Sequence, residues 1–225
     1  MKKTSLAVFA TAMSLIFSSC SSEETMLPQE QNSKILKTYK VKRDATGAYS
    51  VDFNLSENAI VDKVVDTKTN LKEFSLYSTN NQTERNYDEN LSINNSQLRI
   101  GFVDNNVNKK QYISITDDIT SFNKKSTDIA LLDSYSITSN EDGTFGLDFS
   151  VKSNSNVSFV YNEEIKTYEV HLESGANAAA NYTRTLEKEE GEVLKIDFVN
   201  HIANVSGKGS EAGAIRKPVI IIDSD

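Results

Sequence analysis

Two stretches of the chain repeat the same pattern at a fixed offset of 96 residues. YKVKRDATGAYSVDF, from Tyr39 to Phe53, aligns without a gap with YSITSNEDGTFGLDF, from Tyr135 to Phe149. The same offset pairs LRIGFVD, which begins at Leu98, with LKIDFVN, which begins at Leu194. Because apolar residues pair with apolar residues throughout, the pattern predicts a duplication whose two copies share one fold.

The register changes near the end of the chain. KKQYISITDD, which ends at Asp118, resembles RKPVIIIDSD, which ends at Asp225, at an offset of 107. The second copy has therefore gained 11 residues, which the glycine-rich, polar segment from Val205 to Ala214 accommodates best as a loop. Loops vary without disturbing a core, so this insertion is a candidate contact surface.

Each copy has the alternation of apolar and polar residues that is typical of strands with one buried face. The alternating apolar residues are Tyr49, Val51, Phe53 and Leu55 in the first copy and Phe145, Leu147, Phe149 and Val151 in the second. The segments DATG and NEDGT, which precede these runs, predict hairpin turns that need left-handed backbone angles. Tyr49, Phe53, Phe145 and Phe149 are predicted to be buried.

The same pattern predicts strands in the first copy at 35–43, 47–56, 59–66, 71–78, 88–93, 97–104 and 110–117. Seven short strands in about 100 residues favour an all-β fold of two tandem immunoglobulin-like or fibronectin-like sandwich repeats, at 35–121 and 122–225. The likeness is architectural, because the immunoglobulin cysteine pair and core tryptophan are absent. The alternative is one larger sandwich or barrel in which both copies share a core. For the segment 179–190 the sequence leaves a helical turn and a strand or loop open.

The N-terminus carries a different signal. Lys2 and Lys3 precede an apolar run from Leu6 to Phe17, and Ser18 and Ser19 lead to Cys20, the only cysteine. A basic start, a short apolar stretch and small residues before a cut are typical of secretory signals. The run is too short for a membrane span, which needs about 20 residues.

This segment resembles a bacterial lipoprotein signal, although Phe17 stands where that signal usually has Leu. The resemblance implies that residues 1–19 are removed, that Cys20 receives a diacylglycerol, and that 20–34 is a lipidated, flexible tether. Ser21 stands where an inner-membrane retention signal has Asp, which implies delivery to the outer membrane. Ser22, Glu23 and Glu24 resemble, together with Ser21, the signal that exports Bacteroidota lipoproteins to the cell surface.

Charge and cysteine content exclude several classes of function. Of the 24 basic residues, Lys2 and Lys3 leave with the signal, so 32 acidic residues face 22 basic ones in the mature chain. Nucleic-acid binding needs a basic footprint, and none is present. Attraction of the protein to anionic lipid is excluded on the same grounds, so the lipid on Cys20 must hold the protein at the membrane. With its one cysteine lipidated, the chain has no disulfide and no cysteine metal site.

No catalytic or metal-binding motif emerges from the residues. His171 and His201 are the only histidines, and no spacing links them. Asp52 and Asp148 occupy equivalent positions, as the aspartates of a two-lobed protease do, but neither lies in a D[ST]G turn. Two groups of oxygen-bearing residues have no EF-hand spacing and are ordinary turn formers: Asp104, Asp117 and Asp118, and Asn140, Glu141 and Asp142. We therefore expect no metal, no cofactor and no enzymatic activity.

The sequence as a whole predicts a lipid-anchored outer-membrane or cell-surface protein with a non-catalytic binding, adhesion or scaffold role. Its partners would be the membrane, through Cys20, and a surface protein or glycan. The alternative is a glycan-binding component of a surface polysaccharide-uptake system, for which Tyr77, Tyr87, Tyr161 and Tyr182 are candidates. A third class is a hydrolase that uses acidic residues, which would need two buried carboxylates with raised pKa values in a cleft.

Overall fold

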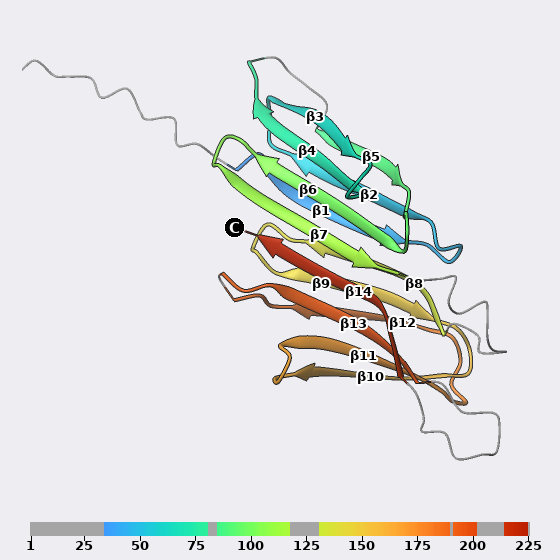
Figure 1. Ribbon diagram of the computed structural model, residues 1–225. Helices are drawn as coiled ribbons and strands as arrows, with labels where there is room; N and C mark the ends of the chain where they lie inside the picture. The colour runs from blue at the N-terminus through green and yellow to red at the C-terminus, as the bar shows by residue number, and fades with distance from the viewer. Residues whose placement is uncertain (1–33, 81–84, 118–130, 190, 202–213, 225) are drawn as a thin grey trace, which may run out of the picture. The chain divides into compact units, whose positions relative to one another are not determined.

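The computed structural model describes residues 34–80, 85–117, 131–189, 191–201 and 214–224 (Figure 1). Throughout these ranges the chain forms strands joined by turns and loops, without a helix, so the all-β prediction is confirmed. The strands of the first copy are β1 (Leu36–Arg43), β2 (Tyr49–Leu55), β3 (Ala59–Asp66), β4 (Leu71–Ser78), β5 (Asn86–Leu91), β6 (Gln97–Asp104) and β7 (Lys109–Thr116). Those of the second copy are β8 (Leu132–Ser139), β9 (Phe145–Val151), β10 (Ser155–Asn162), β11 (Thr167–Ser174), β12 (Ala180–Leu186), β13 (Leu194–His201) and β14 (Ala214–Ser224).

The strand bounds follow the alternation of the sequence closely. All seven strands predicted for the first copy are present, each with its ends within two residues of the predicted ones. In the described part of that segment, 179–189, the structure forms the strand β12, which spans Ala180–Leu186, and no helical turn. The period-two pattern therefore identifies the strands of the first copy correctly.

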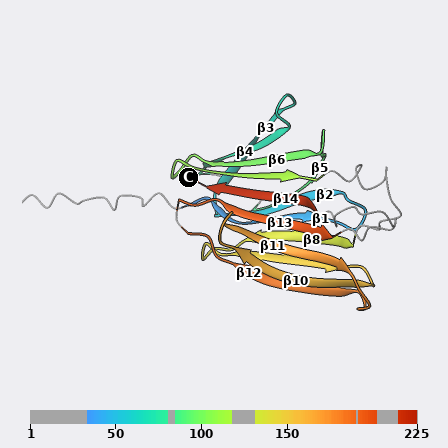
Figure 2. The same cartoon turned by 60° about the horizontal axis from the view of Figure 1, so that its bottom comes forward.

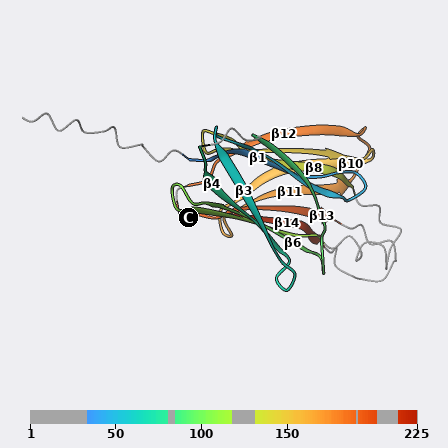
Figure 3. The ribbon, with the colours of Figure 1, turned by 90° about the horizontal axis from the view of Figure 1, so that it is seen from above.

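The strands form two sheets that pack face to face. One sheet has six strands in the order β12-β9-β8-β1-β2-β5, and the other has eight in the order β10-β11-β13-β14-β7-β6-β4-β3. Figure 3 shows the layers from above, with β12, β8 and β1 in one and β13, β14 and β6 in the other. Figure 2 shows how β14 and β13 continue the larger sheet beyond β6. Each sheet thus contains strands from both copies.

The two copies meet at two antiparallel strand pairs, which we call the seam: β1 with β8, and β7 with β14. In the first pair Val41 lies opposite Ile137, its equivalent at the offset of 96. In the second pair Ser114 lies opposite Ile221, its equivalent at the offset of 107. Each pairing is therefore symmetric about the point where equivalent residues meet. Leu98 lies opposite Ile115 on β6 and β7, and Leu194 lies opposite Ile222 on β13 and β14, so the offset changes from 96 to 107 before β14, as predicted.

The order of strands differs from that of an immunoglobulin-like sandwich, whose sheets are antiparallel. β4 runs parallel to β6, with Leu76 beside Asp104, and β11 runs parallel to β13, with Leu172 beside Asn200. Between these partners the chain crosses to the other sheet as β5 or β12 and then returns. The immunoglobulin-like or fibronectin-like arrangement is therefore not confirmed. The structure supports the coarser description of two open sheets packed as a sandwich, and the expected boundary at 121/122 lies outside the described residues.

A single apolar cluster fills the space between the sheets and contains residues of both copies. The four aromatic residues predicted to be buried, Tyr49, Phe53, Phe145 and Phe149, are all less than 5% exposed. Phe53 packs edge-on against Phe102, and the equivalent Phe149 packs edge-on against Phe198. Equivalent aromatic residues therefore connect the two sheets in each copy.

Asx-type turns make the predicted hairpins. Asp44 accepts hydrogen bonds from the backbone of Thr46 and Ala48, and Gly47 follows with a positive φ of 86°. In the second copy Asp142 accepts from Thr144, and Gly143 has a φ of 87°. Glycine is needed here because side chains with a Cβ rarely adopt these angles.

Truncating Phe53 or Phe149 to Ala should lower the free energy of unfolding by about 3–5 kcal/mol, because each change leaves a cavity in the shared cluster. Val64→Ala is the control, since Val64 is 56% exposed and the change should stay within about 0.5 kcal/mol. Urea unfolding followed by circular dichroism measures all three. A loss at Phe53 or Phe149 no larger than that at Val64 would show that the core is wrongly placed.

Candidate functional site

Several predicted site residues lie outside the described part of the chain. These are the lipidation site Cys20, the export residues Ser21, Ser22, Glu23 and Glu24, the turn residue Asp118 and most of the insertion, 205–213. Their roles stay predictions. The candidate site described below is built from other residues.

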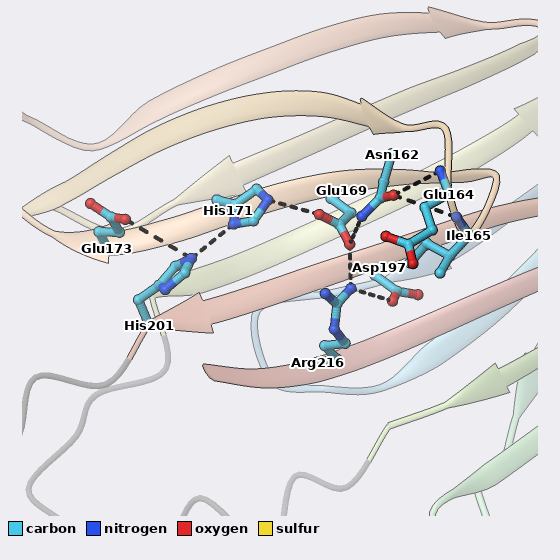
Figure 4. Close-up of polar contacts among 9 residues, drawn as sticks. All are labelled: Asn162, Glu164, Ile165, Glu169, His171, Glu173, Asp197, His201 and Arg216. Atoms are coloured by element: carbon cyan, nitrogen blue, oxygen red, sulfur yellow. Dashed lines mark hydrogen bonds and ion pairs between the residues drawn. The ribbon is translucent and has the colours of Figure 1, made fainter. Parts of the chain in front are cut away.

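Polar side chains gather on the outer face of the eight-stranded sheet in the second copy (Figure 4). Along β11 the period of two places Val170 and Leu172 in the core, and therefore turns Glu169, His171 and Glu173 to the outer face. The neighbouring strands β10, β13 and β14 add polar side chains to the same face. We call this group the outer network; its members are Asn162, Glu169, His171, Glu173, Asp197, His201 and Arg216.

Glu169 is the centre of the outer network. Its side chain is only 5% exposed and is paired with the guanidinium of Arg216, which also bonds Asp197 Oδ2 at 3.1 Å. Asn162 Nδ2 donates a further hydrogen bond to Glu169 at 3.3 Å. Burial alone would raise the pKa of Glu169, but the bonds from Arg216, His171 and Asn162 favour the charged form and hold the pKa below its usual value. Glu169 is therefore an anchored carboxylate, unsuited to donate a proton near neutral pH.

The two histidines occupy the other end of the outer network. His171 Nε2 lies 3.0 Å from Glu169 Oε2, and His171 Nδ1 lies 2.8 Å from His201 Nε2. Because an ionised carboxylate only accepts, His171 donates from Nε2, and its Nδ1 is then the acceptor for the N–H of His201. Glu173 Oε1 approaches His201 Nε2 at 3.9 Å. The arrangement fixes the tautomer of His171.

Sequence reasoning missed this pair because its members are 30 residues apart and share no motif. The parallel register of β11 and β13, which places His171 beside Val199 and Leu172 beside Asn200, brings them together. Such neighbour relations cannot be read from alternation, which reports only the face on which a residue lies. The available signal was that both histidines lie at outward-facing, odd-numbered positions of their strands. This signal does not identify the strand beside each of them.

The first copy has no equivalent of the histidine pair. The positions of the first copy that are equivalent at the offset of 96 hold other residues: Ser75 in place of His171, Tyr77 in place of Glu173 and Asn105 in place of His201. Gly101 replaces Asp197, and a Cβ there would come within 2.9 Å of the Tyr112 ring. Only Glu73 matches Glu169, and it accepts a long 3.4 Å hydrogen bond from Tyr112. The shared fold therefore forms without the histidines.

A second polar cluster is buried near the seam. Arg43 Nε bonds Asp117 at 2.9 Å, and the hydroxyl of Tyr49 donates to the same carboxylate at 2.6 Å. Tyr49 also contacts the hydroxyl of Tyr135 at 3.1 Å, and burial together with the Tyr135 and Asp117 charges raises the pKa of Tyr49. The phenol therefore stays protonated, and the cluster ties the two copies together.

The remaining carboxylate candidates have structural surroundings. Asp52 on β2 and Asp148 on β9 are separated by β1 and β8, so about 14 Å of sheet lies between them at the usual strand spacing. Asp104 accepts hydrogen bonds from the backbone of Ile35 and Leu36. These positions give no support to a dyad of acids in a cleft.

The candidate tyrosines divide into two kinds. Tyr87 stacks on Phe53, and Tyr182 stacks on Phe149, so both extend the core. Tyr77 and Tyr161 are each 38% exposed. Tyr161 lies 4.7 Å from Tyr168, measured between ring centroids, and both line a groove of about 330 Å³ with Glu163, Lys166 and Glu192. Exposed rings beside a groove are therefore present in the second copy.

A further cavity of about 250 Å³ combines apolar walls with positive charge. Leu36, Phe102 and Phe145 form its apolar part. Four lysines and two acidic residues also line it: Lys34, Lys109, Lys110, Lys188, Asp104 and Glu189. Burial, and then the charge of Lys109, lowers the pKa of Lys34. Such a recess can hold an anionic group beside an apolar one.

Comparison with protein-family models, with curated proteins and with solved structures gives no match. Among the described residues, no helix is long and apolar enough to cross a membrane. In that part of the chain, no three His, Cys, Asp or Glu side chains are grouped so that they could hold a metal ion as they stand.

Replacing Arg216 with Ala should cost about 1–3 kcal/mol of stability, because it leaves the buried charge of Glu169 without its cation. The ordinary pKa of a glutamate is 4.5, and in the folded chain that of Glu169 is lower. The charged Glu169 therefore stabilises the folded chain fully above about pH 4.5, and this stabilisation is lost as the pH falls through the lowered pKa of Glu169. In the Arg216→Ala variant, the free energy of unfolding should not show this fall at acid pH.

The control for this change is Arg85→Ala, whose pair with Glu57 is more than half exposed on both sides. Exposed pairs contribute about 0–1 kcal/mol. Urea unfolding of both variants between pH 3 and 7, relative to the parent, makes the comparison. Equal effects of the two changes would contradict the anchoring role of Arg216.

Proposed function

We propose that this chain is a lipid-anchored protein of the outer membrane, exposed at the cell surface, that acts by non-catalytic binding. The observation that carries the proposal is the N-terminal segment, in which a basic start and a short apolar run lead to the only cysteine, Cys20. Ser21, Ser22, Glu23 and Glu24 then supply the features expected for outer-membrane delivery and export. Two or three acyl chains at Cys20 would make the anchor effectively permanent.

A contact role is supported by how the described charged groups are used. Glu169 is held by Arg216, and Asp117 by Arg43, so these buried carboxylates serve to stabilise the sheets. The recesses at Tyr161 and at Lys34 are instead suited to hold a partner group. A binding, adhesion or scaffold role follows from these surfaces more directly than hydrolysis does.

The proposal includes an origin by duplication, with each copy a β-sandwich repeat. Support comes from the matching strand pairs: Tyr39 lies opposite Phe53 on β1 and β2, and Tyr135 lies opposite Phe149 on β8 and β9. The two copies then diverged, as the outer network and the groove occur in the second copy. A duplicated scaffold with one specialised copy is well suited to binding.

Cys20→Ser should move the protein from the membrane fraction to the soluble fraction, because the thiol that carries the lipid is lost. The double change Glu23→Ala and Glu24→Ala should leave the protein in the membrane but lower its cleavage by protease added to intact cells. Fractionation and protease accessibility, each followed by immunoblotting, provide the measurements. Membrane association of a processed Cys20→Ser chain would contradict the anchor, and unchanged accessibility of the double variant would contradict the export signal.

The second candidate function is glycan binding, and the groove beside Tyr161 and Tyr168 favours it. Aromatic rings form apolar platforms for sugars, and the neighbouring Glu163, Lys166 and Glu192 can hydrogen-bond hydroxyl groups. This reading places the protein in surface polysaccharide uptake.

Under this second reading, Tyr161→Ala should abolish the retardation of the full chain in native gels that contain soluble amylopectin, xylan or mannan. Tyr77→Ala is the matched control, since Tyr77 is equally exposed but does not line this groove. Retardation by none of the three polysaccharides, or an equal effect of both substitutions, would count against this groove as a glycan site.

A further inference from the structure

The histidine pair of the outer network presents two ring nitrogens to each other. His171 Nδ1 and His201 Nε2 are 2.8 Å apart, and their ring planes differ by 19°. One proton between the nitrogens holds the pair together. A metal ion can bind both nitrogens once His201 carries its ring proton on Nδ1 instead of Nε2, which frees the Nε2 lone pair.

We propose that His171 Nδ1, His201 Nε2 and the carboxylate of Glu173 form a binding site for a divalent transition-metal ion of the zinc class. Two imidazoles and one carboxylate, with a water in the fourth position, are a ligand set that zinc accepts. The inference rests on the geometry of the outer network and stands independently of the lipid anchor and of glycan binding.

The side chains must turn to receive an ion, because the two ring nitrogens now face each other along one hydrogen bond and their lone pairs must converge on the ion. At zinc bond lengths of 2.0–2.1 Å, tetrahedral ligand atoms lie about 3.3 Å apart. The two nitrogens, now 2.8 Å apart, must separate slightly, while Glu173 Oε1, now 3.9 Å from His201 Nε2, must come closer. The side chain of Glu173 is 58% exposed and that of His201 37%, so both have room to turn and water can reach the ion.

The surroundings of His171 are those of a metal-ligating histidine. Such a histidine donates its other ring N–H to a carboxylate, which fixes the tautomer and orients the ring. Glu169 fills this role for His171 at 3.0 Å, and it is itself held by Arg216 and Asn162. His171 Nδ1 therefore carries no proton, and its lone pair points to His201, from which it accepts a hydrogen bond.

The first copy serves as an internal control for this interpretation. It builds the same strands and the same parallel register with Ser75, Tyr77 and Asn105 at the equivalent positions. Since these residues cannot form the site, the fold does not explain why the second copy has two histidines and a glutamate together. A metal ligand would account for it, and the excess of acidic over basic residues, 32 against 24 in the whole sequence, favours a cation.

The test titrates the full chain, purified in detergent, with ZnCl₂ in an isothermal calorimeter, and with MgCl₂ as a hard-cation control. We expect one zinc ion per chain and no uptake of magnesium. His171→Ala and His201→Ala should each weaken zinc binding by about 100-fold or more, and Glu169→Gln by about 10-fold, through loss of the orienting bond. Ser75→Ala, the matched change in the first copy, should leave binding unchanged.

A second measurement needs no substitution and so does not depend on how a variant folds. In the parent protein with ¹⁵N-labelled histidine, one equivalent of zinc should shift the resonances of His171 Nδ1 and His201 Nε2 together, while His171 Nε2 keeps its proton. Absence of zinc uptake would overturn the proposal. So would ring resonances that do not move, or affinity that survives both histidine substitutions.

Discussion

The pairing of strands across the seam is the interaction on which the rest of the structure depends. Without it, β1 and β7 of the first copy, and β8 and β14 of the second, would be edge strands with a row of unpaired backbone groups. Joining them satisfies these groups and makes the apolar cluster continuous. Polar contacts reinforce the seam, since Arg43 bonds the carbonyl of Asp133 and the hydroxyls of Tyr49 and Tyr135 meet.

A shared core allows the outer surfaces of the copies to differ. Tyr112 covers Gly101 on the first copy, whereas the second has Asp197 in place of that glycine and Arg216 bound to it. Both solutions leave the inner residues, such as Phe102 and Phe198, in equivalent packing. The outer face can therefore differ between the copies without a large effect on the fold, as the histidine pair of the second copy does.

Alternation and self-similarity were sufficient to predict the strands, the buried aromatic residues and the two offsets, because burial on one face imposes a period of two on each strand. They could not reveal strand order, since the face of a residue does not determine which strand lies beside it. The parallel pairing of β11 with β13 was therefore missed, and with it the contact between His171 and His201. The seam was foreseen only as the alternative of a shared core, because the sequence contains no signal for which edges pair.

Cooperativity of unfolding tests the shared core most directly. Amide hydrogen exchange in increasing urea can follow Val51 in the first copy and Leu147 in the second, both fully buried at equivalent positions. If the seam makes one structural unit, both amides should become exposed in the same global transition, with the same free energy and the same dependence on urea. Two separate transitions, one for each copy, would contradict the account and show that the copies are independent domains.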